Sequence, residues 1–247
     1  MDELAYRMMA ADERRHWWWC GRRAILGRML DDLFASGVAP RGTLYDLGCG
    51  VGANLELLEQ FGPAVGYEGA DAAVALAHSL GRANVHKADL ALGEAALADT
   101  PPPGGVVLFA DVLEHLEDER PALALAARLL LPGGILIATV PALPALWGPA
   151  DEFNHHRRRY TRRSLVAAIE PRFRIRRVTY FNSLLLGPIA AIRLLERVLR
   201  LPGAEEARLP SRPVNALLKR IFAAEAPLLQ RTDLPIGVSL LCVAQKP

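Results

Sequence analysis

The sequence has little cysteine, little net charge and no long apolar run. Three cysteines among 247 residues, with no Cys-x-x-Cys pair, argue against a disulfide scaffold and a thiolate zinc site, and indicate a reducing compartment. A net charge of +2 is too small to indicate a nucleic-acid partner. The longest apolar stretch, residues 183–192, is far shorter than the roughly 20 residues that span a bilayer. Residues 1–15 lack the apolar core of a secretory signal. We therefore expect a cytoplasmic protein, either soluble or peripheral at the inner face of the membrane, that binds no nucleic acid.

What is present is an apolar chain with an uneven distribution of charge. Hydrophobic residues make up 51% and charged residues 23% of the sequence, which excludes a disordered or collagen-like chain. The length indicates one large domain, or one domain with an appendage. Residues 151–200 carry 12 arginines against four acidic side chains, whereas the rest of the chain is mildly acidic. This basic block is either a solvated surface or a site for an anionic substrate group or an anionic membrane.

Short apolar runs alternate with helical patterns through the middle of the chain. Strands are expected at residues 43–47, 64–68, 84–88, 106–110 and 135–140, and helices at residues 54–61, 72–80 and 119–131. This alternation predicts parallel strands joined by right-handed helical crossovers, which is a doubly wound α/β sheet. Residues 100–105 are expected to form a stiff loop, residues 201–213 a linker, and residues 237–244 a final strand.

An amphipathic helix is expected over residues 188–201. Its polar face carries Arg193, Arg197 and Arg200, and its apolar face carries Ile189, Ile192, Leu195 and Leu199. The interpretation that we favour is a helix that packs its apolar face on the sheet. The alternative is a helix that lies on a membrane surface.

A glycine-rich loop follows the first predicted strand. It reads Asp46-Leu47-Gly48-Cys49-Gly50-Val51-Gly52, and glycines at alternate positions allow a tight turn and a close approach to a ligand. The spacing is G-x-G-x-G, whereas a pyrophosphate-binding fingerprint reads G-x-G-x-x-G. The carboxylate of Asp46 would repel a pyrophosphate and suits an ammonium group. The loop therefore favours S-adenosylmethionine over NAD, and an NAD-dependent dehydrogenase is disfavoured.

Two further acidic residues follow the next predicted strands. Glu68 ends the second strand, where a carboxylate accepts hydrogen bonds from ribose hydroxyls. Asp89 follows the third strand, where an acid can accept from an adenine amino group. Together with Asp46 they indicate one nucleoside site at the ends of adjacent strands. The alternative is an ordinary glycine turn with surface acids.

The chain resembles the class I S-adenosylmethionine-dependent methyltransferases. The matching segments are D-L-G-C-G-V-G-A-N at 46–54, V-G-Y-E at 65–68, D-V-L-E-H-L at 111–116 and L-L-P-G-G-I-L at 130–136. Further segments resemble a bacterial subgroup related to the ubiquinone-type O-methyltransferases: H-W-W-W-C-G-R-R at 16–23, V-P-A-L-P-A-L-W ending at residue 147, D-E-F-N-H-H-R-R-R-Y-T at 151–161, Y-F-N at 180–182 and G-V-S-L-L at 237–241.

The resemblance implies a fold and a division of the chain. The fold is a Rossmann-like, doubly wound, seven-stranded sheet with an antiparallel last strand, an N-terminal helical cap and a C-terminal helical insertion. The implied regions are a cap at 1–40, a cofactor-binding core at 41–150, and a basic, substrate-side region at 151–247 with amphipathic helices and the final strand. The chain departs from the family at Gly104-Gly105, where Phe-Asp is usual, and at Gly69-Ala70-Asp71, where a Pro or Ser motif is usual.

The resemblance also implies the cofactor residues. They are Asp46, Gly48, Cys49, Gly50, Gly52, Asn54, Glu68, Gly69, Asp89, Leu90, Ala110 and Asp111. Trp18 and Arg22 are implied to close over the cofactor, with Arg22 paired to its carboxylate. The alternative for residues 17–19 is a hydrophobic lid or packing cluster.

Methyl transfer to a hydroxyl needs alignment, exclusion of water and a base. His156 is the first candidate base and His155 the second, and the alternative is that both are structural or merely exposed. Arg158, Arg159 and Tyr160 are the candidate contacts to an acceptor. Asp111, Glu114 and His115 resemble a metal-binding cluster of the ubiquinone-type enzymes. We expect no metal, and this cluster is the alternative.

The resulting prediction is an S-adenosylmethionine-dependent methyltransferase. We expect O-methylation of a small acceptor that is acidic or linked to a lipid or glycan, with peripheral membrane contact as an accompanying option. The alternative is a catalytically idle protein that binds the cofactor or associates with membranes. The sequence leaves the acceptor, the methylated atom and the oligomeric state open.

Overall fold

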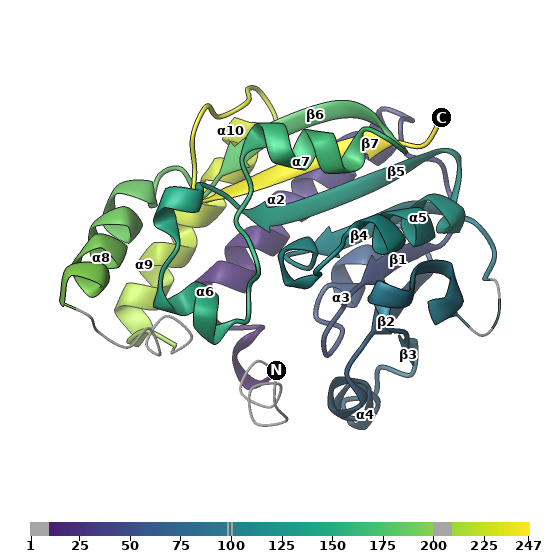
Figure 1. The fold of residues 1–247 in the computed structure, drawn as a ribbon, viewed down its shortest axis with the longest axis horizontal. Coiled ribbons are helices and arrows are strands. Elements are labelled where there is room, and N and C mark those ends of the chain that lie inside the picture. Colours follow the sequence, from purple (N-terminus) through teal and green to yellow (C-terminus); the bar gives the residue numbers. More distant parts are fainter. Residues whose placement is uncertain (1–9, 98, 100, 200–208) are drawn as a thin grey trace.

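The computed structural model describes residues 10–97, 99, 101–199 and 209–247, and its centre is one mixed sheet (Figure 1). Seven strands lie in the order β3-β2-β1-β4-β5-β7-β6. The strands are β1 (Leu44–Leu47), β2 (Ala64–Glu68), β3 (Val85–Lys87), β4 (Gly104–Ala110), β5 (Leu130–Pro141), β6 (Arg174–Phe181) and β7 (Ser239–Gln245). β7 runs antiparallel to both of its neighbours. The predicted fold class is therefore confirmed, including the antiparallel last strand.

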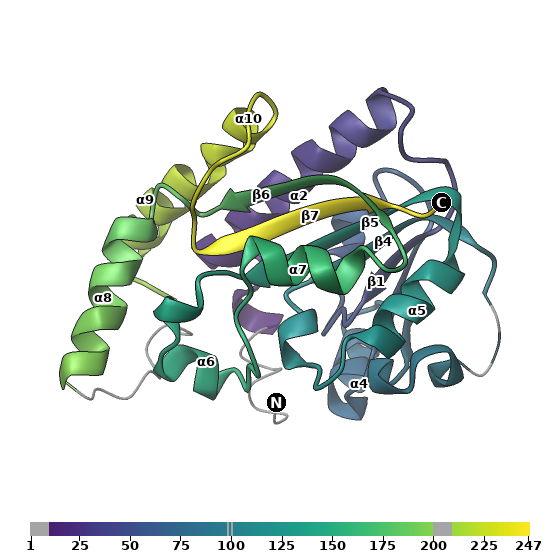
Figure 2. The ribbon, with the colours of Figure 1, turned by 45° about the horizontal axis from the view of Figure 1, so that its top comes forward.

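Helices cover both faces of the sheet (Figures 1 and 2). The α-helices are α2 (Trp17–Ala35), α3 (Leu55–Leu58), α4 (Asp71–Ser79), α5 (Arg120–Leu129), α6 (Pro149–Phe153), α7 (Arg162–Ile169), α8 (Leu186–Leu199), α9 (Arg212–Ala223) and α10 (Glu225–Leu229). Short 3₁₀ helices are η1 (Leu90–Ala96), η2 (Leu113–His115) and η3 (Pro144–Leu146). Helices α8 to α10 form the predicted insertion between β6 and β7.

Burial on both faces explains the continuous apolar run of β4. Val107 and Phe109 lie in the cluster under α5 and α7, and Val106 and Leu108 lie in the cluster under α2. Since successive strand residues point to opposite faces, a strand covered on both sides needs apolar residues at every position. The N-terminal helix α2 packs into the same core as the sheet, and the boundaries of the three predicted regions stay a prediction.

Several predicted boundaries differ from the structure. The helix expected at 54–61 is only α3, and the helix expected at 119–131 ends at Leu129, where β5 begins. The last two residues of the loop expected at 100–105 belong to β4, which begins at Gly104. Strand β6 was not singled out, because its sequence R-I-R-R-V-T-Y-F places three arginines in an edge strand.

The Gly104-Gly105 pair is explained by close backbone contacts at the start of β4. A Cβ atom at Gly105 would lie 2.0 Å from the carbonyl oxygen of Pro40, and one at Gly104 would lie 2.2 Å from that of Thr43. The amide of Gly105 donates to the Thr43 carbonyl over 2.9 Å. Side chains are therefore excluded here, and the departure from the family pattern is a packing requirement.

We expect Gly105→Ala to lower the free energy of unfolding by about 1–3 kcal/mol, as overpacked sites do. Urea denaturation monitored by circular dichroism measures this change. Gly187→Ala is the control, because nothing lies within 4 Å of a Cβ atom built at Gly187. Equal stability of Gly105→Ala and wild type would show that the strand can shift freely.

Helix α8 corrects the favoured interpretation of residues 188–201. Leu194, Leu195 and Val198 are 63%, 54% and 69% exposed, and no residue of α8 is fully buried. Arg193 points inward instead, so the helix presents its apolar face away from the protein. Arg200 and the expected linker at 201–208 lie outside the described residues. Among the described helices, none is long and apolar enough to cross a membrane.

Candidate functional site

The glycine loop between β1 and α3 has the backbone conformation that its sequence predicts. Gly48, Gly50 and Gly52 have φ angles of 75°, 57° and 84°, a region that favours glycine. A Cβ atom at Gly48 would lie 2.7 Å from the Val112 side chain, which closes the loop against the segment after β4. The amides of Gly48 and Cys49 donate to the Tyr67 carbonyl. The loop is thus held at the carboxyl ends of β1, β2 and β4.

Glu68 is fixed at this loop by its own hydrogen bonds. Its Oε2 atom accepts from the Gly50 amide at 2.8 Å, and its Oε1 atom accepts from the Ala70 amide at 2.9 Å. Each carboxylate oxygen can accept two hydrogen bonds, so both retain capacity for a ligand. The residue therefore combines a rigid position with the acceptors that ribose hydroxyls need.

Asp46 is fully buried beneath the loop. Its Oδ2 atom accepts from Asn54 Nδ2 at 3.2 Å, and its Oδ1 atom has no hydrogen-bond partner among the described residues. Burial raises the pKa of Asp46 to about 7, although Asn54 and Arg22 act in the opposite direction. An orphaned acceptor in a glycine cradle fits a ligand that brings a donor, so these residues fit an S-adenosylmethionine-type cofactor.

The raised pKa of Asp46 makes the stability of the free protein depend on pH. The folded state binds the Asp46 proton more tightly than the unfolded state does. The free energy of unfolding that this proton contributes is therefore lost as pH rises from about 4 to about 7. We expect Asp46→Asn to gain stability over wild type across this range and to keep a constant advantage above it. Urea titrations at several pH values measure the difference. Asp71→Asn is the control, because the Asp71 side chain is 89% exposed.

The remaining predicted cofactor residues lie around the same edge. Asp89 is exposed, and its Oδ1 atom accepts from the Ala91 amide at 3.0 Å to cap η1. Leu90 and Cys49 are buried in the apolar clusters, and burial raises the pKa of the Cys49 thiol. Gly69 follows Glu68 directly and has room for a Cβ atom. The structure thus brings these positions to one strand edge, and their cofactor contacts stay a prediction.

Arg22 reaches the end of β4 from the N-terminal helix. It donates to the Ala110 carbonyl at 3.1 Å and forms an ion pair with Asp111. Asp111 has a φ of 59° and also accepts from Thr139 Oγ1 at 3.1 Å. The Trp18 ring stacks with that of Phe181, with centroids 6.4 Å apart, and packs at a tilt against that of Phe222, with centroids 5.3 Å apart. These contacts match the packing cluster that was the alternative for residues 17–19.

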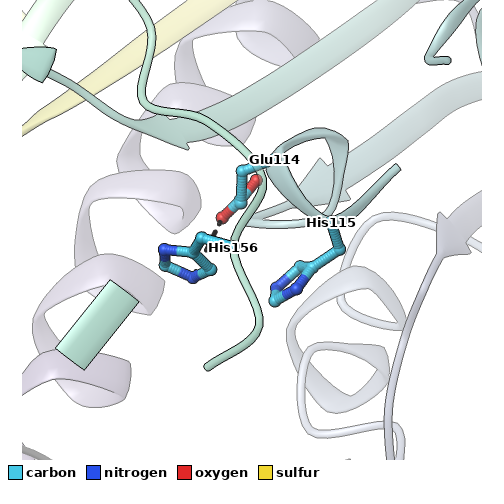
Figure 3. A group of neighbouring side chains, drawn as sticks. All are labelled: Glu114, His115 and His156. Atoms are coloured by element: carbon cyan, nitrogen blue, oxygen red, sulfur yellow. Dashed lines mark ion pairs between the residues drawn. The ribbon is translucent and has the colours of Figure 1, made fainter. Parts of the chain in front are cut away.

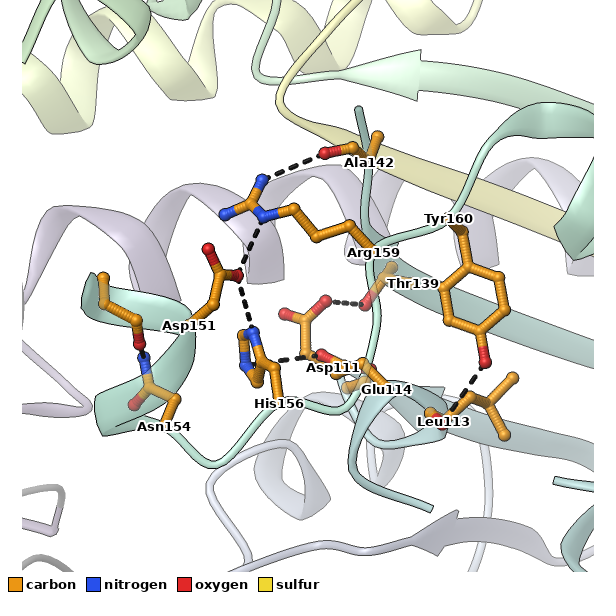
Figure 4. Close-up of polar contacts among 12 residues, drawn as sticks. Asp111, Leu113, Glu114, Thr139, Ala142, Asp151, Asn154, His156, Arg159 and Tyr160 are labelled. Atoms are coloured by element: carbon orange, nitrogen blue, oxygen red, sulfur yellow. Dashed lines mark hydrogen bonds and ion pairs between the residues drawn. The ribbon is translucent and has the colours of Figure 1, made fainter. Parts of the chain in front are cut away.

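Asp151 is the centre of a buried polar network beside this edge (Figure 4). Its Oδ1 atom accepts from His156 Nδ1 at 2.9 Å and Arg159 Nε at 2.8 Å. Its Oδ2 atom accepts from the Gly148 amide at 2.9 Å and Arg193 at 2.8 Å. Burial raises the pKa of Asp151, but the His156 hydrogen bond and the two arginine charges outweigh it, so the pKa lies well below its usual value. The network holds Asp151 as a carboxylate.

His156 faces Glu114 and His115 with its other nitrogen (Figure 3). The Nε2 atom lies 4.0 Å from Glu114 Oε1, and the ring centroids of His156 and His115 are 4.9 Å apart. Burial, and then the nearby His156, lower the pKa of His115 to about 4. Burial raises the pKa of Glu114, whose two oxygens have no hydrogen-bond partner in the described part of the chain.

These three side chains could hold a metal ion, since one ligand atom of each lies within 4.8 Å of the others. The predicted set contained Asp111 instead of His156, and the structure changes it because Asp111 pairs with Arg22. Histidine nitrogens with a carboxylate suit zinc and similar ions. Metal binding stays the alternative for this cluster.

The predicted acceptor contacts and the second base lie in different surroundings. Arg159 is 7% exposed and bonded to Asp151 and the Ala142 carbonyl, so it positions the network and has no open face toward an acceptor. Tyr160 is buried and donates to the Leu113 carbonyl at 3.3 Å. Arg158 pairs with Glu119 and borders an open hollow of about 700 Å³. His155 is exposed, with a φ of 56°.

Sequence reasoning missed Asp151, Thr139 and Arg193. Asp151 stands in the D-E-F-N-H-H segment, five residues before His156, so its carboxylate beside a candidate base was an available signal. Arg193 lies 42 residues from Asp151, and no local pattern predicts that pairing. Thr139 lies in the apolar run of β5 and is fully buried.

Comparison with known proteins decides the family. A family model for a methyltransferase domain matches residues 13–172, which is more than half of the chain. The chain belongs to this methyltransferase family. The match includes the glycine loop, Glu68, Asp111 and the Asp151–His156 pair, and it ends before β6. In this methyltransferase, the helical insertion α8–α10 therefore lies outside the part that the family model describes.

Solved structures share the fold of the methyltransferase. A Haloferax volcanii protein in complex with the Trm112 methyltransferase activator has a TM-score of 0.58 and 18% identity, covering 99% of this chain and 94% of its own. An Archaeoglobus fulgidus SAM-dependent methyltransferase has a TM-score of 0.54 and 18% identity, covering 96% and 99%. A geranyl diphosphate methyltransferase in complex with SAM has a TM-score of 0.54 and 17% identity, covering 91% and 85%. No curated protein sequence matches the chain.

Proposed function

We propose that this methyltransferase transfers a methyl group from S-adenosylmethionine to an oxygen of a small acceptor. One observation carries the choice of cofactor: Glu68 is locked by the Gly50 amide beside the buried, partly unpartnered carboxylate of Asp46. The two carboxylates suit the ribose hydroxyls and a donor of the amino-acid part. Solved structures of similar fold include enzymes that are named for the same cofactor.

In the proposed mechanism, the chain aligns the acceptor and moves one proton. The cofactor, when bound, supplies an electrophilic methyl group on its sulfonium. Asp151 accepts the Nδ1 hydrogen of His156 and so leaves Nε2 as the basic nitrogen. His156 Nε2 would take the proton of the acceptor hydroxyl, and Asp46 and Glu68 would hold the cofactor that supplies the methyl group. Figure 4 shows His156 beside Asp111 and Glu114, close to the end of β4.

For the acceptor we propose a small molecule with an anionic group, linked to a lipid or glycan. Two features support this class. Arg157 and Arg158 follow His156 directly in the chain, and Arg157 is half exposed, so cationic side chains lie beside the proposed base. The apolar outer face of α8 lies on an element that contacts Asp151 through Arg193, which suits an acceptor with an apolar part.

The test is release of S-adenosylhomocysteine with a panel of hydroxyl acceptors, in which each anionic or lipid-linked compound has a neutral, water-soluble counterpart. We propose that turnover favours the anionic members and that Arg158→Ala loses this preference. Arg128→Ala is the matched control, because the Arg128 side chain is 39% exposed against 35% for Arg158 and also pairs with a glutamate, Glu94. An unchanged preference in Arg158→Ala would contradict the role of Arg158.

The same assay separates the alternatives. A catalytically idle protein would bind S-adenosylhomocysteine and turn over none of the acceptors. A metal at Glu114, His115 and His156 would make turnover sensitive to EDTA and restorable by a divalent ion. We propose turnover that is insensitive to EDTA.

A further inference from the structure

The outer face of α8 is an exposed apolar surface at one end of the molecule (Figures 1 and 2). The exposed large side chains are Ile192, Leu194, Leu195, Val198 and Leu199, each between 52% and 69% exposed. At the angular spacing of an α-helix, these residues occupy one broad face. Scattered apolar side chains are ordinary on a protein surface, but a contiguous face of this kind marks an interaction site.

The orientation of α8 is fixed by polar contacts on its inner face. Arg193 donates to the Leu146 carbonyl at 2.9 Å and to Asp151 Oδ2 at 2.8 Å, and its side chain is 10% exposed. Turning the apolar face inward would break this buried ion pair and remove one of the two arginines that neutralise the buried carboxylate of Asp151. The helix therefore turns Arg193 and Glu196 toward the protein and most of its apolar side chains outward.

Exposed basic side chains lie on α8 itself and on the neighbouring helix α9. Arg197 is exposed on α8, and Arg212, Lys219 and Arg220 are exposed on α9, which lies beside α8 in both views. Val214 and Leu217 add 48% and 58% exposed apolar side chains on α9. An apolar surface bordered by lysine and arginine complements a bilayer with anionic headgroups, into which the apolar side chains insert. Two copies of the same basic surface would repel each other, which disfavours self-association.

We propose that the outer face of α8, with the exposed residues of α9, docks on the surface of an anionic lipid bilayer. The helices lie in the plane of the interface and do not span the membrane. Because Arg193 on the opposite side of α8 contacts Asp151, the Asp151–His156 pair would lie directly behind the docked helix. This inference stands on exposure, charge and geometry alone, and it holds whichever acceptor the enzyme uses.

The test is flotation of the full chain with vesicles of phosphatidylcholine and phosphatidylglycerol, and with vesicles of phosphatidylcholine alone. The apolar variant is Leu194→Glu/Val198→Glu, and the charge variant is Lys219→Glu/Arg220→Glu. Leu92→Glu is the matched control, because Leu92 is also 60% exposed but lies on η1, away from α8. Circular dichroism and S-adenosylhomocysteine binding report that each variant is folded.

We expect wild type and Leu92→Glu to bind the anionic vesicles, with binding that falls as salt is raised. Each double variant should lose about tenfold or more of the bound fraction, as loss of apolar insertion or of two basic charges predicts. Absence of wild-type binding to anionic vesicles would overturn the proposal, and so would equal binding by the apolar variant. A wild-type dimer that Leu194→Glu/Val198→Glu dissociates would overturn it in favour of a second copy of the chain.

Discussion

His156→Ala is expected to lower kcat by about 100- to 10,000-fold, which is the usual contribution of a positioned general base. In the proposed mechanism Nε2 of His156 is the basic nitrogen, because Nδ1 is hydrogen-bonded to Asp151 at 2.9 Å and Nε2 faces Glu114. Binding of S-adenosylhomocysteine should stay within about twofold of wild type, because the side chain receives a proton and is not assigned to the cofactor. Steady-state methyl transfer and calorimetry measure the two quantities.

Two further variants distinguish loss of the base from a structural effect of the substitution. His156→Asn retains a donor toward Asp151 and removes the basic nitrogen, so it should be as inactive as His156→Ala and more stable. His155→Ala removes the neighbouring exposed histidine and should keep wild-type kcat. Full activity of His156→Asn would show that His156 has a structural role and is not the general base.

Glu68→Ala is expected to weaken binding of S-adenosylhomocysteine by about 100-fold or more. Hydrogen bonds to a charged group contribute about 1.5–3 kcal/mol each, and the ribose offers two hydroxyls. The substitution also frees the Gly50 amide from its 2.8 Å bond, which loosens the glycine loop. Isothermal titration calorimetry at constant salt measures the change.

Glu68→Gln and Glu94→Ala complete that experiment. Glu68→Gln keeps one acceptor oxygen and should lose about tenfold, since it removes the charge but not the shape. Glu94→Ala removes an exposed carboxylate that pairs with Arg128 and should bind as wild type does. Wild-type affinity in Glu68→Ala would contradict the assignment of the ribose site.

The central sheet could be predicted from the sequence because its strands are buried on both faces. The continuous apolar runs at β4 and β5 are typical of strands covered on both faces, and the glycines at 48, 50 and 52 allow the left-handed backbone that the loop adopts. Edge strand β6 was not predictable because Arg176 and Arg177 are adjacent and interrupt the alternation of polar and apolar residues that indicates a strand.

The sequence pattern of α8 could not predict which face of the helix packs against the protein. Helical periodicity defines two faces, but it does not say which face meets the protein. The packed face is the one that carries Arg193, which pairs with the buried carboxylate of Asp151, 42 residues away in the sequence. Arg159 also pairs with Asp151, from only eight residues away, and this pairing explains why its side chain is buried although the local sequence suggested an acceptor contact.

The central claim is that the glycine loop with Asp46 and Glu68 binds S-adenosylmethionine. The most direct measurement is calorimetric titration of the wild-type chain with S-adenosylhomocysteine, with Asp46→Ala titrated alongside. The account predicts one site per chain with micromolar affinity for wild type and no measurable binding for Asp46→Ala. A folded wild-type chain that binds no S-adenosylhomocysteine would contradict the account.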